Sequence, residues 1–259
     1  CLRPLTVRSS SASMTSIPTS GRPAQCRLPT CLLHTSHAAH EQLPLYVADL
    51  RSLAEQAQQP LSREHITQAL TMIQGHVRRT LERATPETVT LLAMLDDAQV
   101  ASLLEEVDDN IAEAAEKLED QTDEDRREDA VKRVKNWMED RYGRLSDDQK
   151  ALIEDWSRTR ESRPAEWLDH SRRWRDAFAL TLASRDEPGF AERAAHLLFD
   201  DAALVPEHLL AIRQRNEDRW LDLAAAISAI TTERQRAKLV DYISDFAKDF
   251  DKLAQQRRD

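Results

Sequence analysis

The sequence predicts an all-α protein: an antiparallel multi-helix bundle of about ten helices that follows a disordered N-terminal segment. Three observations favour this class. Only 4 of the 259 residues are glycine, although tight turns and phosphate-binding loops need glycine. Apolar residues recur at spacings of three and four along most of the chain, as on one face of a helix. A hydroxyl residue followed three positions later by glutamine, as in Ser146 with Gln149 and Thr232 with Gln235, marks a helix start.

The first 40 residues differ in composition from the rest. They contain four Arg, all three Cys and no acidic residue, whereas residues 41–259 hold 46 acidic and 32 basic residues, a net charge of −14. We expect residues 1–36 to be a disordered leader and residues 37–259 to form a helical bundle domain, which could divide near 120–123. Two other interpretations of the leader stay open. It could be an organellar transit peptide, since such peptides are rich in Arg and Ser, or a stretch translated out of frame up to about Glu41.

Start and stop residues divide the rest of the chain into helices. Pro60 ends the first helix and Ser62 caps the second. Thr85 followed by Pro86 predicts a separate short helix, because proline is favoured at the first helical position. Gly143 is the expected stop of a later helix. The ten expected helices cover about residues 37–58, 62–83, 85–95, 96–118, 122–142, 146–161, 164–182, 189–198, 206–227 and 232 to near the C-terminus.

The last of these helices has the most regular apolar stripe. Its members alternate at spacings of four and three: Leu239, Ile243, Phe246, Phe250 and Leu253. That spacing is typical of the seam of an antiparallel bundle or a coiled coil.

No group of residues forms a convincing reaction centre, so we expect a protein that is not an enzyme, with no catalytic residue, no cofactor and no metal. His34, His37 and His40 are three apart and drift around a helix, which disfavours a shared metal. Adjacent acids on one helix do not face each other across a substrate, as hydrolysis requires. They therefore indicate solvated helix faces: Glu105, Glu106, Asp108, Asp109, Asp200 and Asp201.

Composition also restricts the partners. The formal net charge of −10 argues against nucleic acid, because the phosphate backbone repels an acidic surface. Arg172, Arg173 and Arg175 surround Trp174, which could stack on bases, but a bundle helix with tryptophan inward explains the pattern better. The five tryptophans are expected in the core; the alternative is a concave aromatic surface for unfolded or lipidic ligands. No apolar run of about 18 residues is present, so no transmembrane helix is predicted.

Several short motifs occur in an order that resembles one known family. The segment from His37 through Leu43-Pro44-Leu45-Tyr46 to Leu53, followed by Gln59-Pro60-Leu61-Ser62, is similar to the DUF6279 bacterial lipoproteins. The later segments Leu145-Ser146-x-x-Gln149 with Trp156 and Trp167, and Thr232-x-x-Gln235-Arg236-x-x-Leu239, resemble later parts of that family. The resemblance covers about residues 37–255. The segment 145–149 is also weakly similar to the Spy and CpxP periplasmic chaperones.

The resemblance implies a compartment rather than an activity. DUF6279 lipoproteins are expected to carry a signal peptide, an acylated cysteine and a periplasmic helical body, so Cys1 is the candidate lipidated residue. The leader here departs from the family, which has an aromatic-rich acidic helix in that place. We therefore expect a periplasmic lipoprotein of a Gram-negative cell envelope, anchored to the outer membrane, that acts as a binding or scaffold module for an unknown envelope partner. The alternative is a chaperone-like holdase.

Overall fold

The computed structural model describes residues 42–200, 202 and 204–255, and these contain nine α-helices and no strand. The all-α prediction is therefore confirmed. The leader, with Cys1 and the three histidines, lies outside the described residues. Across the described ranges, no helix combines the length and the apolar character that a bilayer span needs. The helices are α2 (Leu43–Gln56), α3 (Arg63–Ala93), α4 (Asp97–Asp120), α5 (Asp123–Tyr142), α6 (Asp147–Thr159), α7 (Pro164–Ala183), α8 (Phe190–Phe199), α9 (Glu207–Ala229) and α10 (Glu233–Gln255).

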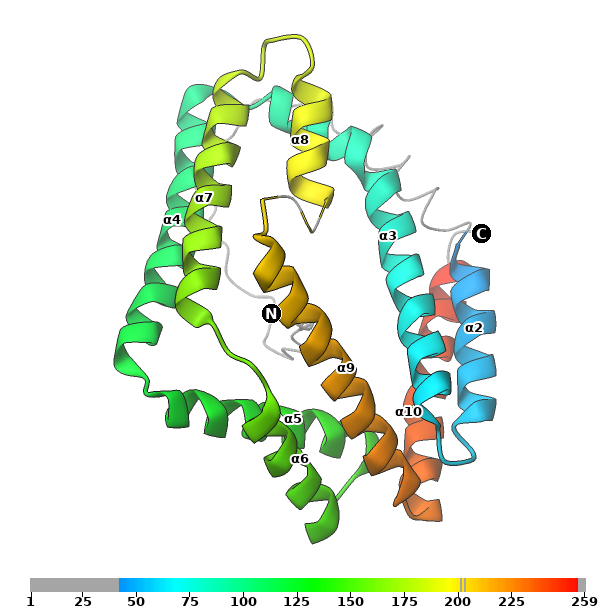
Figure 1. Cartoon of the computed structure of the whole chain (residues 1–259). Helices are drawn as coiled ribbons and strands as arrows, with labels where there is room; N and C mark the ends of the chain where they lie inside the picture. The colour runs from blue at the N-terminus through cyan, green and yellow to red at the C-terminus, as the bar shows by residue number, and fades with distance from the viewer. Residues whose placement is uncertain (1–41, 201, 203, 256–259) are drawn as a thin grey trace, which may run out of the picture.

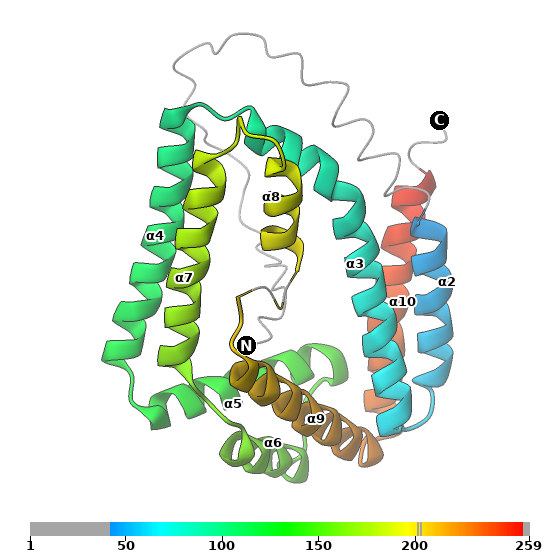
Figure 2. The same ribbon diagram turned by 45° about the horizontal axis from the view of Figure 1, so that its top comes forward.

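The ribbon outlines a frame with helix pairs at its sides (Figure 1). Helices α4 and α7 lie side by side on one flank, and α2 packs along α10 on the opposite flank. The long helix α3 connects the two flanks, α5 and α6 lie at the base, and α9 contacts both α6 and α3 on its way to the start of α10. The tilted view in Figure 2 shows α9 at the base of the frame, beside α5 and α6.

Two separate hydrophobic cores hold this frame together. The first core joins α2, α5, α6, α9 and α10, and its fully buried side chains include Met138, Ile153 and Ile227. The second core joins the C-terminal end of α3 to α4, α7 and α8 around Leu182 and Phe190. Helix α3 contributes to both, since Ile66 packs against the first core and Leu92 belongs to the second. A division of the bundle near 120–123 stays a prediction.

Most helix ends follow from the local chemistry of the sequence. Ser62, Asp96, Thr122 and Ser146 each cap a helix by accepting a hydrogen bond from the backbone N–H three residues later. In all four, the side chain three residues later bonds back to the cap residue. Gly143 ends α5 with φ of 77°, a left-handed conformation that favours glycine.

The predicted helix break at residues 83–85 is wrong, because α3 continues through Pro86. Instead of capping a new helix, the Thr85 hydroxyl donates to the carbonyl oxygen of Leu81 at 2.7 Å. Thr88 and Thr90 donate in the same way to the carbonyls of Ala84 and Pro86. Pro86 has no N–H to donate to the Glu82 carbonyl four residues earlier, and these three hydroxyls bond to other carbonyls, so α3 continues with one backbone hydrogen bond missing.

The apolar stripe of α10 is covered along only part of its length. Leu239 and Ile243 are buried, but Phe246 and Leu253 are 46% and 50% exposed. The end of α5 reaches only the first half of α10, where Lys238 Nζ donates to the Glu139 carbonyl at 3.2 Å. Beyond that level α2 is the main neighbour of α10, which leaves part of the stripe open to solvent.

Candidate functional site

Three tryptophans meet where α5, α6 and α9 come together at the base of the frame. Trp220 of α9 makes edge-to-face contacts with Trp137 of α5 and Trp156 of α6, with ring centroids 5.4 and 5.9 Å apart. All three are partly buried against the first core. Such contacts between rings stabilise a junction beyond the burial of area alone.

The cluster is extended by a stacked arginine. The Arg141 guanidinium lies 3.8 Å from the centroid of a Trp137 ring and 4.9 Å from that of Tyr242 on α10. Burial lowers the pKa of this guanidinium, and nearby Tyr242 and Asp140 oppose that effect. Since a cation over a ring face is attracted by the ring's negative face, Arg141 links α5 to α10.

One polar atom of the cluster has no partner. Trp156 Nε1 is buried and makes no hydrogen bond within the described part of the chain. A buried donor without an acceptor costs about 1–3 kcal/mol. By contrast, the Nε1 of Trp174 on α7 donates to the Leu197 carbonyl at 3.0 Å.

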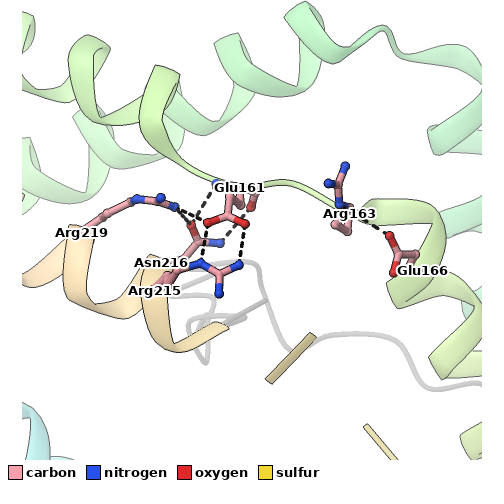
Figure 3. A network of polar contacts seen from close by, with 6 residues as sticks. All are labelled: Glu161, Arg163, Glu166, Arg215, Asn216 and Arg219. Atoms are coloured by element: carbon pink, nitrogen blue, oxygen red, sulfur yellow. Dashed lines mark hydrogen bonds and ion pairs between the residues drawn. The ribbon is translucent and has the colours of Figure 1, made fainter. Parts of the chain in front are cut away.

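The linker between α6 and α7 is fixed to α9 by a single glutamate (Figure 3). Glu161 accepts two hydrogen bonds from Arg215, at 2.8 and 2.7 Å, and a third from Arg219 at 3.0 Å. The Asn216 side chain accepts from the Glu161 backbone N–H at 3.0 Å and donates to its carbonyl oxygen at 2.8 Å. Both the backbone and the side chain of Glu161 are thereby bound to α9.

These arginines keep the Glu161 carboxylate charged. The hydrogen bond from Arg215, opposed by desolvation and aided by Arg219, lowers the pKa of Glu161 to about 2. A carboxylate held this strongly by two guanidinium groups is a poor proton acceptor at neutral pH. The chemistry of the network is therefore that of a clamp, rather than of a general base.

Two further arginines at this junction have no acidic partner. Arg160 follows the last residue of α6 and Arg133 lies on α5, and neither side chain makes an ion pair or hydrogen bond among the described residues. Burial lowers the pKa of the Arg160 guanidinium, and the positive charge of Arg133 lowers it further. Neighbouring arginines such as Arg215 and Arg158 are paired.

A charged groove of about 450 Å³ lies on another face of the pair α5 and α6. Its wall includes the ion pair between Lys135 Nζ and Glu154 Oε1, 2.8 Å apart. The hydrogen bond from Lys135 lowers the pKa of Glu154. Acidic and basic side chains alternate in this groove, and pairing within it reduces the charge that a ligand would meet.

The sequence-derived candidates are distributed over the fold as solvated faces or packed side chains. Asp108 pairs with Arg175 through two hydrogen bonds between α4 and α7. Trp174 stacks on Phe178, with centroids 5.0 Å apart, in the second core. The patch Arg172–Arg175 therefore has its tryptophan packed inward. In the described ranges no three His, Cys, Asp or Glu side chains come together as a metal site; His34, His37, His40 and Asp201 lie outside those ranges.

The tryptophans match the expectation of core packing in four of five cases, since Trp137, Trp156, Trp174 and Trp220 all pack against a core. Sequence reasoning did not find the clamp at Glu161 or the unpaired arginines. Both depend on which helices become neighbours, and charge spacing along the chain carries no signal for that.

Comparison with known families assigns the chain. The profile of DUF6279, a family of unknown function, matches residues 29–209. The chain belongs to the DUF6279 family. In this DUF6279 protein, the matched segment spans α2 to α8 and the start of α9, and so includes Arg133, Arg160 and Glu161. No curated protein and no solved structure matches the chain.

Proposed function

We propose that this DUF6279 protein is a cell-envelope lipoprotein whose helical body acts as a non-enzymatic binding or scaffold module. The resemblance of its helix-start motifs to bacterial lipoproteins supports a periplasmic position with an outer-membrane anchor. The architecture supports a binding role. The two hydrophobic cores are separate, and α3 spans the distance between them.

One observation carries the binding role. In its middle, α3 presents Ile73, Val77 and Leu81 with exposed fractions of 46%, 37% and 40%. These residues are four apart and form one stripe, yet the helix buries only Val89 and Leu92, both near its C-terminal end. An apolar stripe that residues 42–200, 202 and 204–255 leave uncovered is typical of a surface for an apolar helix of a partner.

Site-specific cross-linking tests this role. A photo-reactive amino acid placed at position 77, in the protein expressed in its own cell envelope, should yield a discrete cross-linked product. The same group at position 172, on the exposed charged face of α7, is the matched control and should yield none. Equal products at both positions, or none at position 77, would contradict a partner surface on α3.

The same stripe favours a second candidate, a holdase that binds unfolded polypeptides. Exposed apolar groups on a rigid helical frame are suited to transient contact with many sequences. A holdase should suppress the aggregation of a heat-unfolded test protein at stoichiometric ratios, and Val77→Glu should reduce that suppression. A scaffold with one partner should show no suppression, which separates the two functions.

A further inference from the structure

Tyr46 of α2 lies between α3 and α10, on the flank of the frame that these three helices share (Figure 1). Its ring makes edge-to-face contacts with His76 of α3 and Phe250 of α10, with centroids 4.1 and 6.0 Å apart. Its hydroxyl lies 2.9 Å from Thr80 Oγ1. The middle of α3 and the second half of α10 are therefore at the same level along α2.

Helices α3 and α10 run in the same direction past α2. His76 Nε2 lies 2.7 Å from Asp49 Oδ2, one turn further along α2 than Tyr46. Just beyond the end of α2, the Gln58 carbonyl accepts a hydrogen bond from Arg236, near the start of α10, at 3.2 Å. Later residues of α2 thus meet earlier residues of both neighbours, so α3 and α10 are each antiparallel to α2.

Around the level of Tyr46 both helices expose apolar side chains. The stripe on α3 consists of Ile73, Val77 and Leu81, and α10 exposes Phe246 and Leu253, one turn on either side of that level. Because the two helices are parallel, helical spacing puts Ile73 level with Phe246 and Leu81 level with Leu253. The described part of the chain leaves both stripes uncovered.

The two stripes have opposite charges at their edges. Arg78 lies three residues before Leu81 on α3, and residues three apart are neighbours on a helix surface. By the same spacing, Asp249 borders Phe246 on α10. The side chains of Arg78 and Asp249 are 79% and 71% exposed, and their recorded ion pairs, with Glu82 at 3.9 Å and Lys252 at 3.1 Å, lie within their own helices. Such exposed pairs are weak, so both charges can bind a partner.

We propose that a second copy of this chain covers these stripes in a symmetric dimer, with α3 of each copy packed on α10 of the other. The inference rests on the partner surface proposed above for α3 and names its occupant. A two-fold axis parallel to the helices places α3 opposite α10 of the second copy at the same level, twice. Leu81 then packs on Leu253 of the second copy, and Arg78 faces Asp249 of the second copy.

Charge favours this pairing over the other symmetric ones. Packing α3 on α3 of the second copy would bring the two Arg78 side chains together, and packing α10 on α10 would do the same for Asp249. Like charges that face each other across an interface cost free energy, whereas opposite charges fix the register. The affinity itself comes from burial of the apolar stripes, in which Phe246 is the largest side chain.

Sedimentation equilibrium of the full chain tests the dimer, for which we expect a reversible monomer–dimer equilibrium. Val77→Glu and Phe246→Glu should each raise the dimer Kd about tenfold or more, because each places a charge against an apolar stripe. Both side chains are exposed in the single copy, so the variants should keep the helical circular dichroism of the parent.

A charge swap tests the register. Arg78→Asp and Asp249→Arg should each raise the dimer Kd about tenfold, because each creates like-charge contacts at both symmetric positions. The double variant should return to within about threefold of the parent, a recovery that a merely misfolded variant would not show. Arg172→Asp on α7 is the matched control: it reverses an exposed arginine that is paired with Asp169, and its Kd should stay within about twofold of the parent.

Cross-linking separates failure of the dimer from failure of the proposed function. A photo-reactive group at position 77 of the purified chain should give a product of twice the chain mass, joined to residues 246–253 of the second copy. A chain that stays monomeric, or a double variant no better than the single ones, would overturn the dimer. A different polypeptide attached to position 77 in the cell envelope would overturn the dimer and leave the partner surface in place. No product, or a link within one chain to residues 1–41, would overturn both.

Discussion

The side-chain amides of Gln149 and Gln235 bond to each other in both directions, although 86 residues separate them. Gln235 Nε2 donates to Gln149 Oε1 at 2.8 Å, and Gln149 Nε2 donates to Gln235 Oε1 at 3.2 Å. Each amide oxygen also accepts the backbone N–H of its own helix cap, Ser146 or Thr232, at 3.0 Å. The two helix-start motifs thus form one joint between α6 and α10, in which Gln149 is fully buried.

This joint predicts a large effect of removing either amide. Gln235→Ala should lower the free energy of unfolding by about 2–3 kcal/mol, because it leaves buried groups of Gln149 unpaired. Urea unfolding measures this loss of free energy, with Gln99→Ala as the control variant. Gln99 closes the same kind of capping box on α4 but is exposed, so its loss should cost less than about 1 kcal/mol. Similar costs for the two variants would mean that the glutamines act only as local caps.

A double-mutant cycle measures the pairing itself. Gln149→Ala and Gln235→Ala should be coupled by about 1 kcal/mol or more, since each removes the partner of the other. Additive effects would contradict the mutual hydrogen bonds.

The Glu161 clamp predicts acid sensitivity with a definite sign. The folded pKa of about 2 lies below the ordinary value of 4.5, so the contribution of Glu161 to stability is fully present above about pH 4.5. It is lost as the pH falls from there toward 2. In Glu161→Gln, Tm should be lower than in the parent at pH 7, and the difference should shrink as the pH falls through that window.

The control for this measurement is Glu105→Gln on α4, an exposed glutamate outside the clamp. Its Tm should follow the parent at every pH. A difference between Glu161→Gln and the parent that does not change between pH 7 and pH 3 would show that the charge of Glu161 is not what holds the linker.

The indole N–H of Trp156 has no acceptor among the described residues, so replacing tryptophan by phenylalanine should cost less stability at position 156 than at position 174. Trp174→Phe breaks the hydrogen bond to the Leu197 carbonyl, whereas Trp156→Phe removes a buried donor that has no acceptor. Both lose similar ring area, so Trp174→Phe should be more destabilising by about 1 kcal/mol. Urea unfolding of the two variants decides this, and a greater cost at Trp156 would contradict the described environment of its Nε1.

The continuous helix α3 predicts stabilisation by removing its proline. Pro86→Ala restores a backbone N–H inside the helix, and interior proline costs about 3 kcal/mol relative to alanine. Greater freedom of the unfolded chain offsets about 0.4–1 kcal/mol of that gain. We expect a higher Tm for Pro86→Ala. An unchanged or lower Tm would favour the separate short helix that the sequence suggests.

The sequence predicts features of this fold that depend on near neighbours and misses those that depend on distant ones. Ser146 and Thr122 start helices and Gly143 stops one because their own atoms satisfy the adjacent backbone. Pro86 misleads, because proline suits the first turn of a helix, whereas here it lies inside the continuous helix α3. The contacts of Gln149 with Gln235 and of Glu161 with Arg215 are set by helix packing, so local spacing gives no sign of them.

The most direct test of the envelope role is metabolic labelling with a palmitate analogue. The full open reading frame, with whatever precedes Cys1, is expressed in a Gram-negative host that is then fractionated. We predict a labelled protein in the outer-membrane fraction, and loss of the label when the lipidated cysteine is replaced by serine. An unlabelled protein in the cytoplasmic fraction would contradict the proposal.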